Sequence, residues 1–182
     1  MKKALIVYWS ATGNTEKVAH AIQDGLKQAG LDVTIVKAKG NEILDYFEYD
    51  LVCVGFPSYV FHPPDPMVKF LKGMFDKYGK EERIMWGSPT VAGKQALVFC
   101  TYSGPHSGID EASPAVKYVG QFFVHVGIPV VAEWFVVGEF HGRVDASMVG
   151  KLGDIRGRPT VEDLDKVRID ALGLGEKIRN TQ

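Results

Sequence analysis

The 182-residue sequence has only two cysteines, no excess of either charge and no long hydrophobic run. Cys53 and Cys100 have neither a CxxC nor a metal-ligand spacing, so we expect two buried, reduced thiols and no metal site. With 21 basic and 22 acidic side chains, the formal net charge is −1. A chain without a polybasic surface cannot neutralise many phosphates, which argues against a nucleic-acid partner.

The longest early apolar run, Ala4–Trp9, is too short for a signal-peptide core and far below the roughly 20 residues of a membrane span. We therefore expect a cytoplasmic protein without a membrane span. At 46% hydrophobic residues, the chain has enough apolar side chains for one core, and we expect residues 1–182 to form a single domain.

Strand-like and helix-like segments alternate along the whole chain. Short apolar runs, typical of strands buried on both faces, are Ala4–Tyr8, Val33–Val36, Leu51–Phe56, Ala96–Cys100 and Val130–Val137. Helical periodicity covers Thr15–Ala29 before Gly30, a segment that starts with Asp65 as its N-cap, Ala112–Val126, and Leu164–Ile178 after a capping box at Thr160–Asp163. This alternation predicts an α/β fold with a doubly wound, five-stranded parallel sheet between helical layers.

The loop after the first predicted strand combines hydroxyl groups with a helix start. It consists of Ser10, Ala11, Thr12, Gly13, Asn14 and Thr15. A helix N-terminus offers unpaired N–H donors, so this loop can bind a phosphate although it contains no Lys or Arg. It lacks the Walker and GxGxxG patterns and suits a single terminal phosphate. The alternative is a capped turn rich in Ser and Thr without a ligand.

Ser10–Thr15 resembles the FMN-phosphate signature of the flavodoxin family, [ST]-x-T-G-x-T, at every specified position. The order of strands and helices is similar to that fold over nearly the whole chain, which implies a sheet ordered 2-1-3-4-5. The resemblance further implies FMN as the cofactor. Its phosphate would bind to Ser10, Thr12, Asn14 and Thr15, with Gly13 allowing the backbone to approach.

Two further loops would hold the flavin ring, which needs flat aromatic or apolar walls. The loop after the third strand supplies Pro57, Ser58, Tyr59, Val60 and Phe61, and the loop after the fourth supplies Thr101, Tyr102, Ser103, Gly104 and His106. Tyr59 and Phe61 could instead only cover the adjacent helix. In the second loop the resemblance implies a ring wall from either Tyr102 or His106. His62, His106 and His141 lie in loops that could meet above the flavin edge, and His106 or His62 could donate a proton during reduction.

Val60 departs from the pattern of one-electron flavodoxins, which carry a glycine there and flip a peptide when the ring is half reduced. A β-branched residue resists positive φ, so the flip should be harder. The pattern G-x-P-x-Y, followed by Pro64 and Phe70-Leu71, is similar to NAD(P)H-dependent FMN reductases and quinone reductases of the same fold. Those relatives transfer two electrons. A net charge of −1 also gives little steering toward basic partners.

The glycine-rich segment Gly138–Pro159 is long enough for a lid or a partner surface, although its mixed charges are typical of a solvated loop. Arg156 and Arg158 could alternatively bind a 2′-phosphate or an anionic substrate.

We therefore expect an FMN-binding, flavodoxin-like redox flavoprotein that acts in electron transfer with a redox protein partner. The alternative is a reductase of the same fold that uses NAD(P)H and a small quinone or a flavin, and a third possibility is a flavin-free binding domain. The sequence leaves the oligomeric state open.

Overall fold

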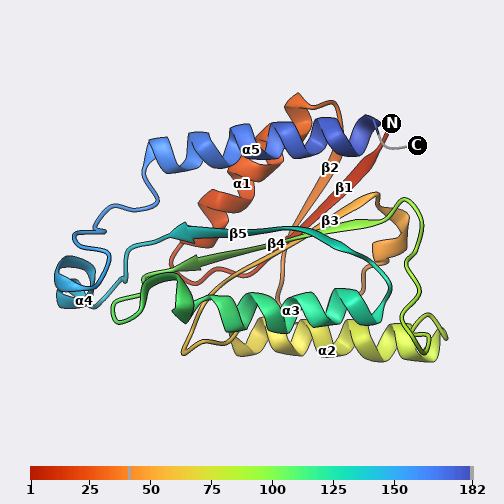
Figure 1. Cartoon of the computed structure of the whole chain (residues 1–182), viewed down its shortest axis with the longest axis horizontal. Helices are drawn as coiled ribbons and strands as arrows, with labels where there is room; N and C mark the ends of the chain where they lie inside the picture. The colour runs from red at the N-terminus through yellow and green to blue at the C-terminus, as the bar shows by residue number, and fades with distance from the viewer. Residues whose placement is uncertain (41, 181–182) are drawn as a thin grey trace.

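The computed structural model describes residues 1–40 and 42–180 and places helices on both faces of a five-stranded sheet (Figure 1). The strands are β1 (Lys3–Tyr8), β2 (Asp32–Lys37), β3 (Leu51–Pro57), β4 (Gln95–Tyr102) and β5 (Val130–Val137). The helices are α1 (Asn14–Gln28), α2 (Asp65–Lys80), α3 (Ser113–His125), α4 (Val144–Val149) and α5 (Val161–Asn180), with short 3-10 helices η1 (Tyr46–Glu48) and η2 (Gly108–Glu111). All neighbouring strands are parallel in the order β2-β1-β3-β4-β5, which confirms the predicted fold.

The core has two layers, one on each face of the sheet. Helices α1 and α5 cover one face and α2 and α3 cover the other (Figure 1). Successive residues of a strand point to opposite faces, so Ile6 packs on the α1 side and Val7 on the α2 side. Cys53 and Cys100 are free and fully buried, as predicted, and burial raises the pKa of both thiols.

The prediction that all five strands are buried on both faces was wrong for β2 and β5. These strands lie at the two edges of the sheet and are only partly covered, and Val131 of β5 is 45% exposed. An edge strand has a neighbouring strand on one side only, so its other side is left open. Among the described residues, no helix is long and apolar enough to cross a bilayer.

Helix ends followed the sequence signals in two places and departed from them in one. Gly30 has a φ of 86° after α1, and the capping box before α5 is formed by reciprocal bonds between Thr160 and Asp163. Asp65, however, is the first residue of α2. Pro64, with a φ of −60°, takes the N-cap position and makes no side-chain capping bond, because the proline ring carries no hydrogen-bonding group.

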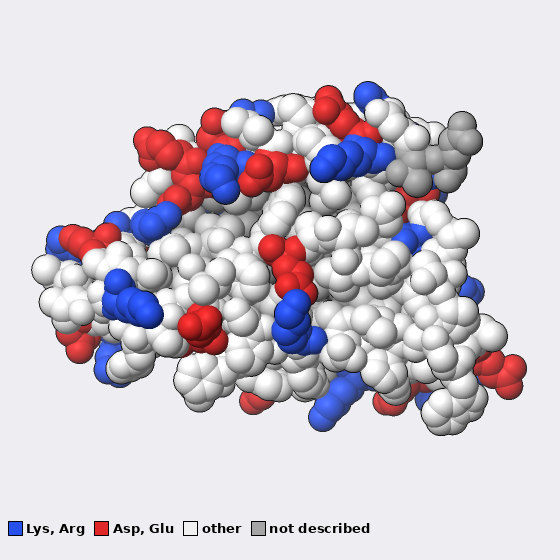
Figure 2. Space-filling model, in the orientation of Figure 1, with Lys and Arg blue, Asp and Glu red and all other residues white. Residues whose placement is uncertain are grey.

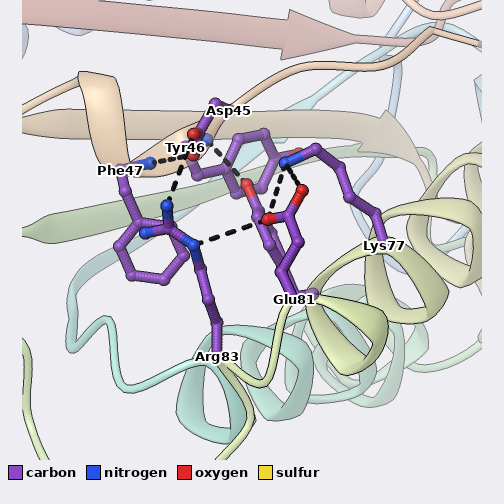
Figure 3. Close-up of polar contacts among 7 residues, drawn as sticks. Asp45, Tyr46, Phe47, Lys77, Glu81 and Arg83 are labelled. Atoms are coloured by element: carbon purple, nitrogen blue, oxygen red, sulfur yellow. Dashed lines mark hydrogen bonds and ion pairs between the residues drawn. The ribbon is translucent and has the colours of Figure 1, made fainter.

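Charged side chains tie the loop before β3 to the end of α2 (Figure 3). Arg83 Nη2 lies 3.8 Å from Asp45 Oδ2, and Arg83 Nε lies 3.4 Å from Glu81 Oε2. Next to these surface pairs, the backbone N–H of Tyr46 donates to the buried phenol oxygen of Tyr78 at 2.6 Å. This end of the molecule is opposite the carboxyl ends of the strands, where the candidate site lies.

Candidate functional site

A cavity of about 830 Å³ lies at the carboxyl ends of β1, β3 and β4. The loops after these three strands line it, together with the segment between β5 and α5, and α4 lies beyond the arrowheads of β4 and β5 (Figure 1). The sequence-predicted site residues that line the cavity are Ser10, Ala11, Thr12, Asn14, Thr15, Pro57, Ser58, Tyr59, Val60, Phe61, Thr101, Tyr102, Ser103, Gly104 and His106. Gly13 is the one predicted residue that is not part of the lining.

The Ser10–Thr15 loop forms a turn directly before α1. Gly13 has a φ of 97°, a conformation that glycine adopts without strain, and its N–H donates to Ser10 Oγ at 3.1 Å. The next N–H groups belong to the first turn of α1, which leaves them without intrahelical acceptors. Thr12 is exposed in the same turn, and its hydroxyl has no partner in the described part of the chain. Hydroxyl and amide donors at a helix start fit an anion.

Two residues of this loop already bond other parts of the wall. Thr15 Oγ1 lies 2.7 Å from Thr101 Oγ1 of β4, and both side chains are buried. The Asn14 amide donates to the carbonyl oxygen of Glu139 at 3.0 Å and accepts from His141 Nε2 at 3.3 Å. Asn14 can therefore contact an anion through its backbone N–H or the second hydrogen of its amide nitrogen, whereas Thr15 has a hydroxyl that is shared with Thr101.

The loop after β3 presents exposed aromatic side chains to the cavity. Tyr59 is 45% exposed, and its ring packs edge-to-face on Trp9 at a centroid distance of 5.9 Å. Val60 has a φ of 49° and Phe61 a φ of 66°, so the expectation that Val60 avoids positive φ was wrong. The two backbone bonds between Tyr59 and His62, of 2.9 and 3.1 Å, close a tight turn that imposes this strain on both residues.

Glu111 joins the two loops that were predicted to hold a ring, a role the sequence analysis missed. Its Oε1 accepts the backbone N–H groups of His106 and Ser107, both at 2.7 Å, and its carbonyl oxygen accepts from Ser58 Oγ at 2.6 Å. Because Glu111 also lines the cavity, one residue fixes both loops and places a carboxylate in the wall. Its position, directly after the second ring loop, was the only local signal for this role.

The segment from Gly138 to Gly150 forms the fourth wall and is more ordered than a solvated loop. It includes α4, and the fully buried Ser147 of this helix receives the Phe140 N–H on its Oγ at 3.0 Å. Its lining residues are Gly138, Glu139, Phe140, His141, Arg143, Asp145, Ala146, Val149 and Gly150. The sequence analysis identified the length of this segment and, apart from His141, did not assign these residues to the site.

Three other candidates lie outside the cavity lining. His62 packs on Tyr118 at a ring distance of 4.6 Å. Arg156 pairs with Asp154, and Arg158 pairs with Asp163, so both guanidinium groups are neutralised by neighbouring carboxylates. The alternative that Arg156 and Arg158 bind an anion in this cavity therefore has no support from their positions.

The charges of the cavity wall are mixed. Burial raises the pKa of the Tyr59 phenol and that of Tyr102, although the positive charge of Arg158 partly offsets the shift at Tyr102. Both phenols are consequently neutral near pH 7 and can donate hydrogen bonds. Among the described residues, Arg143 is the only Lys or Arg in the lining. A phosphate would therefore depend mainly on neutral donors, while a planar ring could lie between the aromatic loops.

Proteins of known families are similar to this chain in sequence and in fold. The family model described as Flavodoxin matches residues 6–111. Over 171 residues, 78% of this chain and 84% of the relative, the chain is 25% identical to the NAD(P)H dehydrogenase (quinone) of Archaeoglobus fulgidus. It is 34% identical over 96 residues to the flavodoxin of Megasphaera elsdenii, covering 46% of this chain and 66% of that protein, just under two thirds.

A solved structure of a flavodoxin from the domain Archaea is similar over 98% of this chain and 99% of its own, with a TM-score of 0.64 and 20% identity. At this identity the likeness shows the shared fold.

Proposed function

The chain belongs to the flavodoxin family, and we propose that it binds FMN with the phosphate at Ser10–Thr15 and the ring between the loops after β3 and β4. The protein is an FMN-binding redox flavoprotein that acts in electron transfer. Bound FMN supplies the redox chemistry, while the protein determines its position and electrostatic surroundings.

Each wall has a separate task in this proposal. The hydroxyls of Ser10 and Thr12 and the first N–H groups of α1 donate to the phosphate. Tyr59 forms one ring wall, and the loop from Tyr102 to His106 forms the other. Glu111 keeps the two ring loops at a fixed separation through its bonds to both. The observation that carries the proposal is that an anion site without Lys or Arg and two aromatic loops open into the same cavity.

The first test is a titration of the purified protein with FMN. We expect bound flavin with quenched fluorescence, and release of FMN when the protein is denatured. Failure to take up added FMN would overturn the proposal and would leave the flavin-free binding domain as the remaining function.

A second candidate function is reduction of a quinone or a flavin with NAD(P)H. The segment 138–150 favours it, because this segment adds a fourth wall to the cavity, in which Arg143 Nε lies 3.7 Å from Asp145 Oδ1. The relative from Archaeoglobus fulgidus, named NAD(P)H dehydrogenase (quinone), also matches over most of its length. In this function NAD(P)H would donate a hydride to the bound flavin.

The two functions differ in their response to pyridine nucleotides. Anaerobic addition of NADPH or NADH bleaches the flavin within seconds if the protein is a reductase. A carrier is reduced by dithionite and by a redox protein partner but not by NAD(P)H.

Figure 2 shows positive and negative side chains side by side, without a large block of one sign on the face drawn. Long-range charge therefore does little to steer a protein partner, and partner exchange should depend only weakly on salt.

A further inference from the structure

The side chain of Asn14 joins the start of α1 to the segment after β5. Its amide nitrogen donates to the Glu139 carbonyl at 3.0 Å, and its amide oxygen lies 3.3 Å from His141 Nε2. An amide oxygen only accepts hydrogen bonds, so Nε2 of His141 carries the proton of this contact. Asn14 is 8% exposed, and both polar ends of its side chain are therefore used inside the protein.

The neighbours of the Asn14 side chain pack closely against it. A Cβ atom on Gly138 would lie 2.8 Å from the Asn14 amide nitrogen, so a side chain at position 138 would displace the Asn14 amide. On the other side, Glu139 donates its N–H to the Arg158 carbonyl at 2.9 Å and accepts the Gly157 N–H on its carboxylate at 2.8 Å. Residues 138–141 are thus held between α1 and the chain that leads to α5.

This arrangement is outside what the family pattern specifies. The signature [ST]-x-T-G-x-T leaves position 14 open, and the family model matches residues 6–111, whereas His141 lies beyond that range. The family pattern therefore assigns no role to this contact, and its role must come from its own geometry.

We propose that Asn14 and His141 form a clamp that couples recognition of the FMN phosphate to the position of the 138–150 wall. The clamp rests on the proposed function, because it acts on a phosphate bound at Ser10–Thr15. Asn14 supplies one of the first N–H groups of α1, and its side-chain bonds hold that N–H in place. Both are positioning residues. The clamp should consequently favour FMN over riboflavin, which has the same ring and no phosphate.

The test compares the dissociation constants of FMN and riboflavin, measured by quenching of flavin fluorescence. Asn14→Ala and His141→Ala should each weaken FMN binding about fivefold, the typical effect of one lost hydrogen bond, and should weaken riboflavin binding less. The double variant should be no weaker than the single ones, because either change opens the same clamp. His141→Gln can still donate to Asn14 and should restore FMN binding. His20→Gln, an exposed histidine on α1, is the matched control and should bind FMN like the wild type.

Equal losses for FMN and riboflavin, additive losses in the double variant, or unchanged FMN binding would each overturn the clamp. If the wild type binds neither flavin, the proposed function fails. Hydrogen exchange of the flavin-free protein then tests whether Asn14 holds the segment 138–150 in place. Faster exchange of the 138–150 amides in Asn14→Ala than in His20→Gln supports it, and unchanged exchange overturns it. Should Asn14→Ala fail to fold, the comparison of His141→Ala with His141→Gln carries the same test.

Discussion

Thr15 Oγ1 lies 2.7 Å from Thr101 Oγ1, and this buried contact joins α1 to the end of β4 inside the candidate site. Thr15→Val removes one hydroxyl and leaves the other without its partner, so we expect a loss of about 1–2 kcal/mol in unfolding free energy. The double variant Thr15→Val/Thr101→Val removes both polar groups and should lose less than the sum of the single variants. Urea unfolding of the flavin-free proteins measures this cycle. Strictly additive losses would show that the two hydroxyls do not interact.

The Ser10 and Thr12 hydroxyls should matter for the phosphate and not for the ring. Thr12→Ala should weaken FMN binding about fivefold, and Ser10→Ala should also weaken it, because the Gly13 N–H loses its acceptor. Riboflavin binding should change little in both variants. Thr90→Ala, in the exposed loop before β4, is a control at the opposite end of the sheet. Equal effects on FMN and riboflavin would contradict the assignment of this loop to the phosphate.

Glu111→Ala should show no selectivity between FMN and riboflavin, because the Glu111 carboxylate holds the second ring loop and not the phosphate loop. The variant releases the N–H groups of His106 and Ser107, and FMN and riboflavin binding should both weaken, by about tenfold. Glu111→Gln keeps an acceptor oxygen and should be less affected. Asp110→Asn removes the same charge from the same short helix as a control. The idea fails if Glu111→Ala affects FMN alone or if Asp110→Asn weakens binding as strongly.

Most of the fold could be predicted from the sequence because the pattern is local. The apolar runs around Ile6 and Val7 face helices on both sides, and the Thr160–Asp163 capping box marks a helix start within four residues of chain. The burial of β5 could not be predicted in this way. Its apolar run resembles that of an inner strand, and only the strand order reveals that one edge has no neighbour.

The site could be predicted where its residues are contiguous, as in Ser10–Thr15. The contact between His141 and Asn14 could not be predicted, because the two residues are 127 positions apart and no local pattern links them. Val60 illustrates a different failure. Its β-branched side chain disfavours positive φ, but the paired bonds between Tyr59 and His62 override this preference.

Tyr46 and Tyr78 should respond differently to loss of the hydroxyl. Burial raises the pKa of Tyr46, and its hydroxyl has no partner among the described residues, so Tyr46→Phe should leave the unfolding free energy unchanged or higher. Tyr78→Phe leaves the buried N–H of Tyr46 without an acceptor and should lower the unfolding free energy by about 1–3 kcal/mol. Urea unfolding of both variants gives the comparison. A loss in Tyr46→Phe as large as that in Tyr78→Phe would mean that the Tyr46 hydroxyl has an unseen partner, such as a buried water.

Asp163 should make stability depend on pH. Its hydrogen bonds from Arg158, supported by the Thr160 N–H, hold the pKa of this carboxyl below its usual range. A lowered pKa in the folded state stabilises the protein above the unfolded pKa, and this contribution is lost as pH falls through the folded value. Asp163→Asn should therefore lower the melting temperature at neutral pH, and the difference from the wild type should shrink at an acid pH below the lowered folded pKa, where the carboxyl takes up a proton.

Asp154→Asn is the control for this prediction, because the Asp154–Arg156 pair is exposed and should contribute little to stability at either pH. The carboxylate of Asp163, by contrast, accepts hydrogen bonds from the Arg158 guanidinium and from the Thr160 N–H before α5. Its loss therefore weakens both the ion pair and the helix cap. If the melting temperatures of Asp163→Asn and the wild type differ by the same amount at both pH values, the ionised carboxylate is not the stabilising form. The variant would then be less stable only because the asparagine amide is a poorer helix cap.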